Sequence, residues 1–281
     1  MASSVSIPKA SGVPADRDLV EQKLTDLLGS RTIPEGGPVH EAMRYAVLGG
    51  GQRVRPLLAL RVGRLLGADA GRVLEAAAAV ELIHCASLIV DDLPCMDDEQ
   101  WRRESPTVHV AFGEATAILA AFGLVALAAR SMVEDASDCP HLRERVRFQT
   151  RLLQCLDCSG LIAGQSMDLE LRGERRESAR TQLTELKTVP LFLLAAQAGL
   201  AFAGADQRRE RGIMRYAREY GIAFQMTDDY LDGELDNWDY LNEQYERTRA
   251  AIAPFGRHGR PLVELIDYLH AKASEKDRRH R

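Results

Sequence analysis

Residues 73–92 have the sequence VLEAAAAVELIHCASLIVDD, and this stretch decides how the rest of the chain must fold. Apolar residues occupy nearly every side of a helix drawn through it, which predicts a helix surrounded by other helices. Two aspartates, Asp91 and Asp92, stand at its end. The stretch therefore predicts a helical core with carboxylates at its edge.

The segments on both sides of this stretch also show helical spacing. Apolar residues recur at i, i+3 and i+4, as in Ile213, Tyr216 and Ala217. No stretch alternates apolar and polar residues with β-branched enrichment, so an all-α protein without strands is expected. We expect two amphipathic helices before Gly49, one from Pro56 to Gly67, the helix at 73–92, and others at about 115–134, 141–171, 178–203, 208–232, 238–253 and 259–273.

The chain is expected to form one domain, because it has no internal repeat and no linker rich in Pro or Ser after residue 16. The expected parts are a disordered N-terminus over 1–15, a helical domain over 16–273 and a basic tail over 274–281. The most apolar run, 115–129, is shorter than the ~20 residues of a bilayer span. We therefore interpret this run as a buried helix and expect no membrane span.

Composition excludes several classes of protein. With 46% hydrophobic and 27% charged residues in 281, the chain can form a packed core. Acids outnumber bases by 41 to 36, giving a net charge of −5, so no basic field suits nucleic acid. The five cysteines are scattered through apolar stretches, which is typical of reduced thiols. We expect a cytoplasmic protein without a nucleic-acid partner.

Two groups of carboxylates follow apolar segments. In the first, Pro94 disfavours continued helix, so Asp97 can fold back beside Asp91. In the second, Asp228 and Asp232 are spaced i, i+4 and share one helix face. One such group alone is more often a solvated acidic surface, but two of them, each ending an apolar helix, favour a common ligand. The groups consist of Asp91, Asp92, Asp97 and Asp98, and of Asp228, Asp229 and Asp232.

The expected ligand is a hard cation with a phosphate. Carboxylates at a helix C-terminus repel one another and face the negative end of the helix dipole, so a positive charge should compensate them. Oxygen ligands suit Mg²⁺, which usually completes its shell with water and substrate phosphates. Because an all-α protein has no strand to lead into a Rossmann turn or a P-loop, side chains and metal must hold any phosphate.

A set of motifs resembles the trans-isoprenyl diphosphate synthases, whose members include farnesyl and geranylgeranyl diphosphate synthases. The resemblance extends from about Glu41 to Asp232. It implies a single-domain helical bundle of the isoprenoid synthase type, with a deep central cavity and about three Mg²⁺ ions at its mouth. The motifs are Gly50-Gly51-Gln52-Arg53-Val54-Arg55-Pro56, Asp91 to Asp97, Arg102-Arg103, Gly164-Gln165-Ser166-Met167-Asp168, Lys187-Thr188 and Phe224-Gln225-x-x-Asp228-Asp229-x-x-Asp232.

The resemblance also implies the role of each residue. The metal ligands would be Asp91, Asp92, Asp97, Asp228 and Asp232, and the catalytic set would be Asp91, Asp92, Asp97, Lys187, Asp228 and Asp229. The allylic diphosphate would contact Arg102, Lys187 and Gln225, and isopentenyl diphosphate would contact Gln52, Arg55, His84 and Arg103. Thr188, Phe224 and Asp168 complete the substrate-binding set.

The implied activity is a Mg²⁺-dependent prenyltransferase that joins isopentenyl diphosphate to an allylic diphosphate. Ala86 and Ser87 are small where the family's chain-length residue is bulky, which favours a C20 product such as geranylgeranyl diphosphate. Lys187 lies in an apolar stretch where an unpaired lysine would be costly, so it favours a functional partner. By the same resemblance we expect a homodimer that uses the helix near 115–129.

Two departures from the family pattern leave alternatives open. Gln52 replaces the loop lysine, which removes a charge from the isopentenyl diphosphate site. No lysine occurs between Lys187 and Lys272, and a lid segment after Asp232 is missing. A weakly active or non-catalytic subunit of a heteromeric synthase is one alternative. A class I terpene synthase-like enzyme is another, which the retained Arg55, His84 and Arg103 disfavour.

Overall fold

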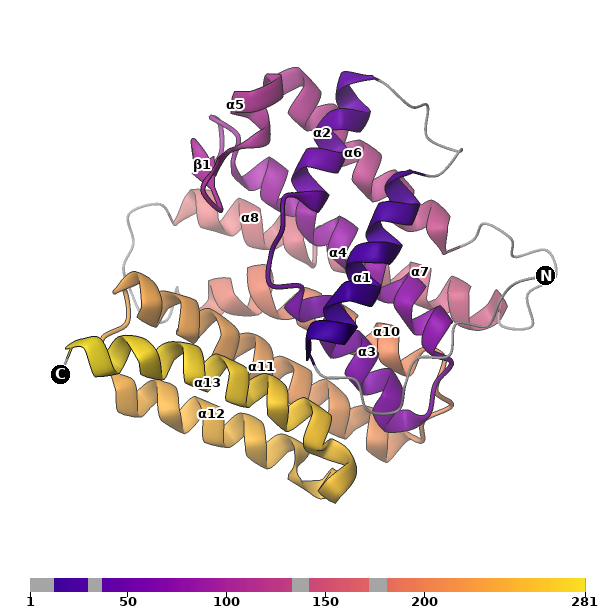
Figure 1. The fold of residues 1–281 in the computed structure, drawn as a ribbon, viewed down its shortest axis with the longest axis vertical. Helices are drawn as coiled ribbons and strands as arrows, with labels where there is room; N and C mark the ends of the chain where they lie inside the picture. The colour runs from indigo at the N-terminus through magenta and orange to yellow at the C-terminus, as the bar shows by residue number, and fades with distance from the viewer. Residues whose placement is uncertain (1–12, 30–36, 133–141, 172–180, 281) are drawn as a thin grey trace.

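Helix α4 (Ala70–Asp91) lies at the centre of the fold, as its sequence predicts. Its residues are buried along most of its length, and it packs against α3 (Val54–Leu66), α6 (Glu114–Ser131) and α10 (Val189–Leu200). Figure 1 shows the helix passing behind α1 (Val13–Leu28) in the computed structural model, which describes residues 13–29, 37–132, 142–171 and 181–280. The core helix predicted from residues 73–92 is confirmed.

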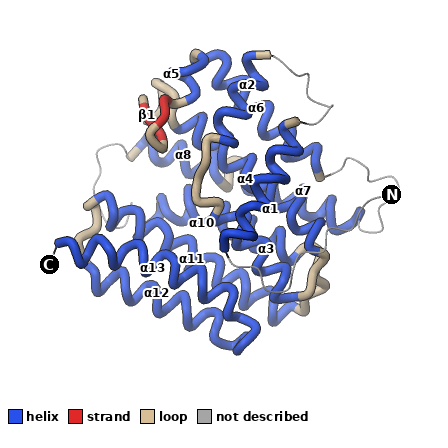
Figure 2. Tube along the Cα trace, viewed as in Figure 1, coloured by secondary structure: helices blue, strands red, loops and turns tan. Residues whose placement is uncertain are grey.

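Helices make up nearly all of the described residues (Figure 2). The three C-terminal helices α11 (Gln207–Asp232), α12 (Trp238–Ile252) and α13 (Arg260–His280) pack side by side and form one end of the molecule (Figure 1). Side chains from α1 through α13 contribute to one hydrophobic core. The remaining helices are α2 (Pro38–Leu48), α5 (Val108–Phe112), α7 (Leu142–Leu156) and α8 (Leu161–Glu170), with a π-helical turn η2 (Thr184–Thr188) and a 3₁₀ segment η3 (Ala253–Gly259).

The single helix expected over 141–171 is wrong, because the chain breaks between α7 and α8. The Asp157 carboxylate accepts hydrogen bonds from the backbone N–H of Ser159 at 2.7 Å and from its hydroxyl at 2.5 Å. Such a local side-chain bond competes with the helix. Gly160 follows, and a Cβ there would lie 2.1 Å from the Cys155 carbonyl oxygen. Residues 178–180 of the next expected helix lie outside the described residues.

The expectation of no strands also needs a small correction. Strands β1 (Trp101–Arg102) and β2 (Ser105–Pro106) form a two-residue antiparallel hairpin. The connecting residues Arg103 and Glu104 both have positive φ, 53° and 65°. Positive φ at both central positions is the requirement of the tight turn that joins such strands. The hairpin is too short for a period-2 pattern to reveal it, and the sequence analysis also missed the short helix α5.

Both ends of the expected domain extend further than predicted. Residues 13–15 belong to α1, and α13 continues through the expected basic tail to His280. In that tail, Lys276 Nζ donates hydrogen bonds to the carbonyl oxygens of Tyr230 and Leu231, both at 2.7 Å. The last helix is thereby attached to the end of α11. Residues 1–12 of the expected disordered N-terminus lie outside the described residues.

Helix α6 is buried on one face only. Ala117, Ala120 and Leu124 are buried, whereas Leu119 and Phe122 are 55% and 69% exposed. The expectation that residues 115–129 form a fully buried helix is therefore wrong for one face. Both α4 and α6 are long and apolar enough to cross a membrane, but buried core helices pass the same test. The expected absence of a membrane span stays a prediction.

Candidate active site

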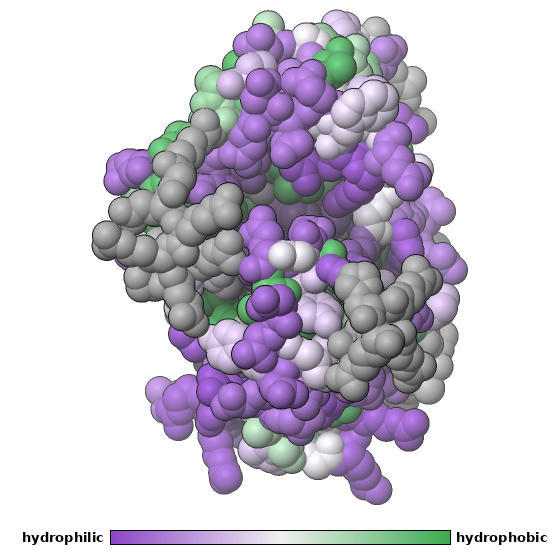
Figure 3. Space-filling model, turned by 90° about the vertical axis from the view of Figure 1, so that its left-hand side faces the viewer, coloured by the Kyte–Doolittle hydropathy of each residue, from purple (hydrophilic) through white to green (hydrophobic). Residues whose placement is uncertain are grey.

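A polar cavity of about 720 Å³ lies where α4 ends, between the loop before α3, η2 and α11. Figure 3 shows a hollow near the centre of one face of the molecule, with hydrophilic residues around it. Twelve residues that the sequence singled out line the cavity, and they come from five separate segments. They are Gln52, Arg55, His84, Ser87, Asp91, Arg102, Arg103, Lys187, Thr188, Phe224, Gln225 and Asp228.

The first acidic group folds back on itself, as Pro94 predicts. The backbone N–H of Asp97 donates to the carbonyl oxygen of Asp91 at 2.8 Å. Asp91 is the last residue of α4 and lines the cavity, whereas Asp97 is exposed and does not line it. Burial, with a smaller contribution from the neighbouring Asp97 and Asp92 carboxylates, raises the pKa of Asp91 to about 6 against the opposing effect of Lys187. Asp91 is therefore a carboxylate that needs a positive ligand.

Asp92 has a different environment from Asp91. Its side chain is 4% exposed and accepts hydrogen bonds from both Nε and Nη2 of Arg102. This ion pair attaches the β1–β2 hairpin to the end of α4. Asp92 lies outside the lining of the polar cavity. A metal role for Asp92, or a diphosphate contact by the paired nitrogens of Arg102, would require this ion pair to open.

The second acidic group sits on the last turn of α11. Asp228 lines the cavity and lies 3.5 Å from Lys272 Nζ of α13. Burial raises the pKa of Asp228, and Lys272 opposes the shift. Asp229 accepts a hydrogen bond from Gln225 Nε2 at 2.8 Å, and Asp232 is exposed outside the cavity lining. Gly233, with φ of 82°, caps α11.

Where the sequence lacks the family's lid segment after Asp232, the structure has only a short connection. Only residues 233–237 join α11 to α12. The positive charge closest to Asp228 therefore comes from Lys272 on α13 rather than from a segment that follows the aspartates. The sequence held no signal for this contact, because the two residues are distant along the chain.

Lys187 reaches the cavity from η2. Its Nζ lies 2.5 Å from an Asp168 carboxylate oxygen, so Asp168 holds the lysine rather than lining the cavity. Gly164 permits this arrangement, because a Cβ there would lie 2.8 Å from the Leu186 backbone. Thr188 donates to Gln225 Oε1 at 2.7 Å. The Gly164-to-Asp168 and Lys187-Thr188 motifs thus form one unit of packed helices that presents a cation to Asp91.

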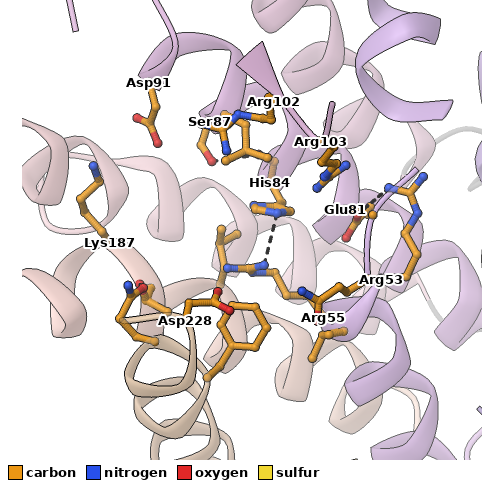
Figure 4. A pocket seen from close by; sticks show the side chains of 18 of the residues that line it. Arg53, Arg55, Glu81, His84, Ser87, Asp91, Arg102, Arg103, Lys187 and Asp228 are labelled. Carbon is orange, nitrogen blue, oxygen red and sulfur yellow. Dashed lines mark hydrogen bonds and ion pairs between the residues drawn. The ribbon is translucent and has the colours of Figure 1, made fainter. Parts of the chain in front are cut away.

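Basic side chains line another part of the cavity wall. Arg55 Nη1 lies 3.2 Å from Nε2 of His84, and its guanidinium stacks on Phe192 and Phe224 at 4.7 and 5.6 Å from the ring centroids. Burial, followed by the nearby arginines, holds the pKa of His84 well below its ordinary value. His84 is therefore a neutral imidazole near pH 7. Figure 4 shows Arg55, His84 and Arg103 together, with Asp91 and Asp228 on opposite sides of the cavity.

Arg53 precedes α3, and its side chain points into the core, where its charge is paired. It adopts φ of 53° and is fully buried. Its guanidinium pairs with Glu21 at 2.8 Å and with Glu81 at 2.7 Å. A buried arginine with two carboxylate partners is held in one orientation. The charged Glu81 inside the apolar stretch 73–92 is the sequence signal that could have revealed this pair.

An apolar cavity of about 380 Å³ adjoins the polar one and shares Ser87, Asp91 and Lys187 with it. Ala86 lines this second cavity, and its small side chain leaves the space open. The opposite wall includes Phe122 and Val125 of α6. A ligand with a charged head and an apolar tail could therefore occupy both cavities, with the head near Asp91.

The cavity carboxylates suit Mg²⁺ that binds together with an anion. Among the described residues, no three Asp, Glu, His or Cys side chains group closely enough to hold a metal by themselves. Mg²⁺ commonly takes one or two carboxylates plus water and substrate phosphates, and so does not need such a group. Burial raises the pKa of both Asp91 and Asp228 despite a nearby lysine, so a bound cation would favour their ionised forms. Asp91 and Asp228 would therefore be able to hold Mg²⁺ together with a diphosphate.

Comparison with known proteins agrees with this arrangement. Residues 38–239 match the polyprenyl synthetase family. The chain is 40% identical to geranylgeranyl pyrophosphate synthase 4 of Arabidopsis thaliana over 199 residues, which cover 69% of this chain and 52% of that protein. It is also 40% identical to the mitochondrial geranylgeranyl pyrophosphate synthase 6 of the same plant, over 85% of this chain and 72% of that protein. The chain thus spans about half the length of several of these relatives.

Solved structures share the fold over a larger part of the chain. A geranyltransferase from Legionella pneumophila superposes with a TM-score of 0.86 at 33% identity and covers 94% of this chain and 96% of its own. An FPP/GFPP synthase from Zymomonas mobilis gives a TM-score of 0.83 at 30% identity, over 92% of this chain and 98% of its own. The all-α fold expected from the sequence is thereby confirmed.

Proposed function

Because the chain belongs to the polyprenyl synthetase family, we propose that it condenses isopentenyl diphosphate with an allylic diphosphate to form a longer trans-prenyl diphosphate. One observation carries this proposal. Asp91 and Asp228 face each other across a polar cavity that Arg55 and Arg103 also line, and Asp91 also borders an apolar cavity. Two diphosphates and one prenyl chain each have a suitable environment there.

In this proposal, the acidic side chains of the cavity bind metal and the basic ones bind the diphosphates. Asp91 and Asp228 would hold Mg²⁺, which supplies positive charge to the departing diphosphate when it is bound. Lys187, kept near Asp91 by Asp168, would contact the same diphosphate. Arg55 and Arg103 would bind the diphosphate of isopentenyl diphosphate, and the neutral His84 can donate a hydrogen bond without adding charge.

The reaction balances without any further reagent. The allylic C–O bond breaks and its electron pair leaves with the diphosphate. The double bond of isopentenyl diphosphate supplies the electrons for the new C–C bond. A proton then leaves the resulting cation, and the departed diphosphate accepts it. The apolar wall around Ala86 and Phe122 would exclude water from the cationic carbon.

Product length is the finer part of the proposal. A C20 product requires room beyond the aspartates, and Ala86 leaves such room in the apolar cavity. Ala86→Phe should fill it and shift the products to shorter chains, as measured by chromatography of the dephosphorylated alcohols. The control is Ala111→Phe, because Ala111 is exposed on α5. If Ala86→Phe leaves the products unchanged, this cavity does not determine the chain length of the product.

Assembly is a further part of the proposal. The exposed apolar face of α6 includes Leu119 and Phe122, and a second copy of the chain would cover it. A relative described as a heterodimeric geranylgeranyl pyrophosphate synthase large subunit, 39% identical over 71% of this chain, gives a reason to test a heteromer as well. Light scattering of the purified chain, alone and with a partner subunit, distinguishes these states.

The activity test uses purified protein with Mg²⁺, isopentenyl diphosphate and dimethylallyl, geranyl or farnesyl diphosphate. Elongated alcohols that appear only after phosphatase treatment support the proposal. Hydrocarbon formed without isopentenyl diphosphate would instead support a terpene synthase-like activity. No turnover by the chain alone, with activity restored by a partner, would support the subunit alternative.

A further inference from the structure

Two guanidinium groups from distant parts of the chain bind the glycine turn before α3. Arg17 Nη2, on α1, donates to the carbonyl oxygen of Gly51 at 2.9 Å. Arg103 Nη1, from the β1–β2 hairpin, donates to the carbonyl oxygen of Gly50. Gly51 has φ of 137°, and a Cβ there would lie 2.7 Å from Arg103 Nη1. The turn therefore brings the two arginines to adjacent peptide units.

The next residue of the turn, Gln52, is uncharged. Gln52 and Arg17 both line the polar cavity and a neighbouring cavity of about 380 Å³. The Gln52 Oε1 atom is buried and has no hydrogen-bond partner among the described residues. The amide can offer a diphosphate only a neutral hydrogen bond, whereas a guanidinium offers a charge-assisted one. Arg17 thus places a positive charge beside Gln52, which is uncharged.

The charge of Arg17 is available for a ligand. The nearest carboxylate is Glu21, at 4.0 Å from Arg17 Nε. Both oxygens of Glu21 already accept shorter hydrogen bonds from the buried Arg53, at 2.8 and 3.1 Å. The Arg17 side chain is 48% exposed, so it can turn toward a ligand at little cost in packing. Among the described residues, the only ion-pair partner of Arg17 is thus the distant and already occupied Glu21.

We infer that Arg17 binds the diphosphate of isopentenyl diphosphate together with Arg55 and Arg103, and supplies the positive charge that Gln52 lacks. This inference rests on the proposed function. Three guanidinium groups, from α1, α3 and the hairpin, would then surround the diphosphate in the polar cavity. Because Arg17 is held at the glycine turn rather than by the acidic groups, it should act on isopentenyl diphosphate and leave the allylic substrate unaffected.

The test compares Arg17→Gln, Gln52→Lys and the double variant. Arg17→Gln should raise the KM for isopentenyl diphosphate about tenfold, with the KM for the allylic substrate unchanged. Gln52→Lys should restore the affinity in the double variant, because the lysine places a charge at the same diphosphate. Arg17→Lys, which keeps the charge, should lose less than Arg17→Gln. The control is Arg215→Gln, because Arg215 is exposed on α11 outside both cavities.

Calorimetric titration with isopentenyl diphosphate separates this inference from the proposed function, because it needs no turnover. In one outcome, neither the wild type nor any variant turns over, but Arg17→Gln weakens binding about tenfold and Gln52→Lys restores it. This result would support the Arg17 inference and contradict the proposed function. If the wild type turns over and Arg17→Gln changes neither the KM nor the titrated affinity, the inference is overturned. A thermal unfolding curve of Arg17→Gln that matches the wild type confirms that the variant is folded.

Discussion

The two acidic groups share one sequence pattern, but the fold neutralises them differently. In the first, Asp92 is buried and paired with Arg102, ten residues further along the chain. In the second, Asp228 is partly exposed and faces Lys272 from the C-terminal helix at 3.5 Å. The first group thus contains a local, desolvated ion pair, and the second depends on a distant and solvated one.

The difference shows that neighbouring aspartates can have separate functions. Asp91 faces the cavity and has a raised pKa, while Asp92 faces away from it and anchors the hairpin that carries Arg103. A buried ion pair needs both partners, because a single buried charge is costly. The first group therefore combines a ligand-binding carboxylate with a structural one, and each can be tested separately.

The largest effect is expected from removing the carboxylates that line the cavity. Asp91→Ala and Asp228→Ala should each lower kcat for prenyl transfer by about 10³-fold, because each removes a group that would hold the metal beside the departing diphosphate. Asp239→Asn on the surface of α12 is the control. If both alanine variants elongate at the wild-type rate, the metal assignment is wrong.

The next largest effect should be on folding. Arg102→Gln leaves the Asp92 carboxylate buried without its partner and should lower the free energy of unfolding by about 3 kcal/mol. Asp92→Asn combined with Arg102→Gln should recover part of the loss, since it removes the buried charge. Urea unfolding of both variants measures this. A single variant as stable as the wild type would contradict the buried pair.

Asp91→Asn should raise the free energy of unfolding in the absence of metal, whereas Arg102→Gln should lower it. The raised pKa of about 6 means that folding disfavours the ionised carboxylate at neutral pH. Removing the charge should add about 1–2 kcal/mol to the free energy of unfolding, after allowance for solvent screening. The gain should be full above pH 6, should shrink as the pH falls from 6 to 3.8, and should vanish below 3.8, because the carboxyl is then protonated in both states. Thermal unfolding across this pH range checks the sign.

The smallest effect is expected for Lys272→Gln. Its ion pair with Asp228 is about one-third exposed on both sides, so the free energy of unfolding should fall by less than about 1 kcal/mol. A loss as large as that of Arg102→Gln would show that the two acidic groups are neutralised alike. Urea unfolding of both variants in one buffer makes the comparison.

The sequence predicted those parts of the fold that depend on local periodicity. The buried helix over 73–92 and the amphipathic helix over 208–232 correspond to α4 and α11. It failed where one or two residues decide the backbone, as at the Asp157 turn that separates α7 from α8. A helical pattern on both sides of such a turn looks continuous, because periodicity averages over many residues.

The sequence alone determined that this protein is helical, that two carboxylate groups end apolar helices, and that a glycine turn precedes α3. These features follow from spacing and residue type within short segments. Only the tertiary structure decided that Asp92 is bound by Arg102, that Lys272 faces Asp228, and that Arg17 stands beside Gln52. Such contacts join residues from separate helices, and the packing of a whole core fixes which side chains meet.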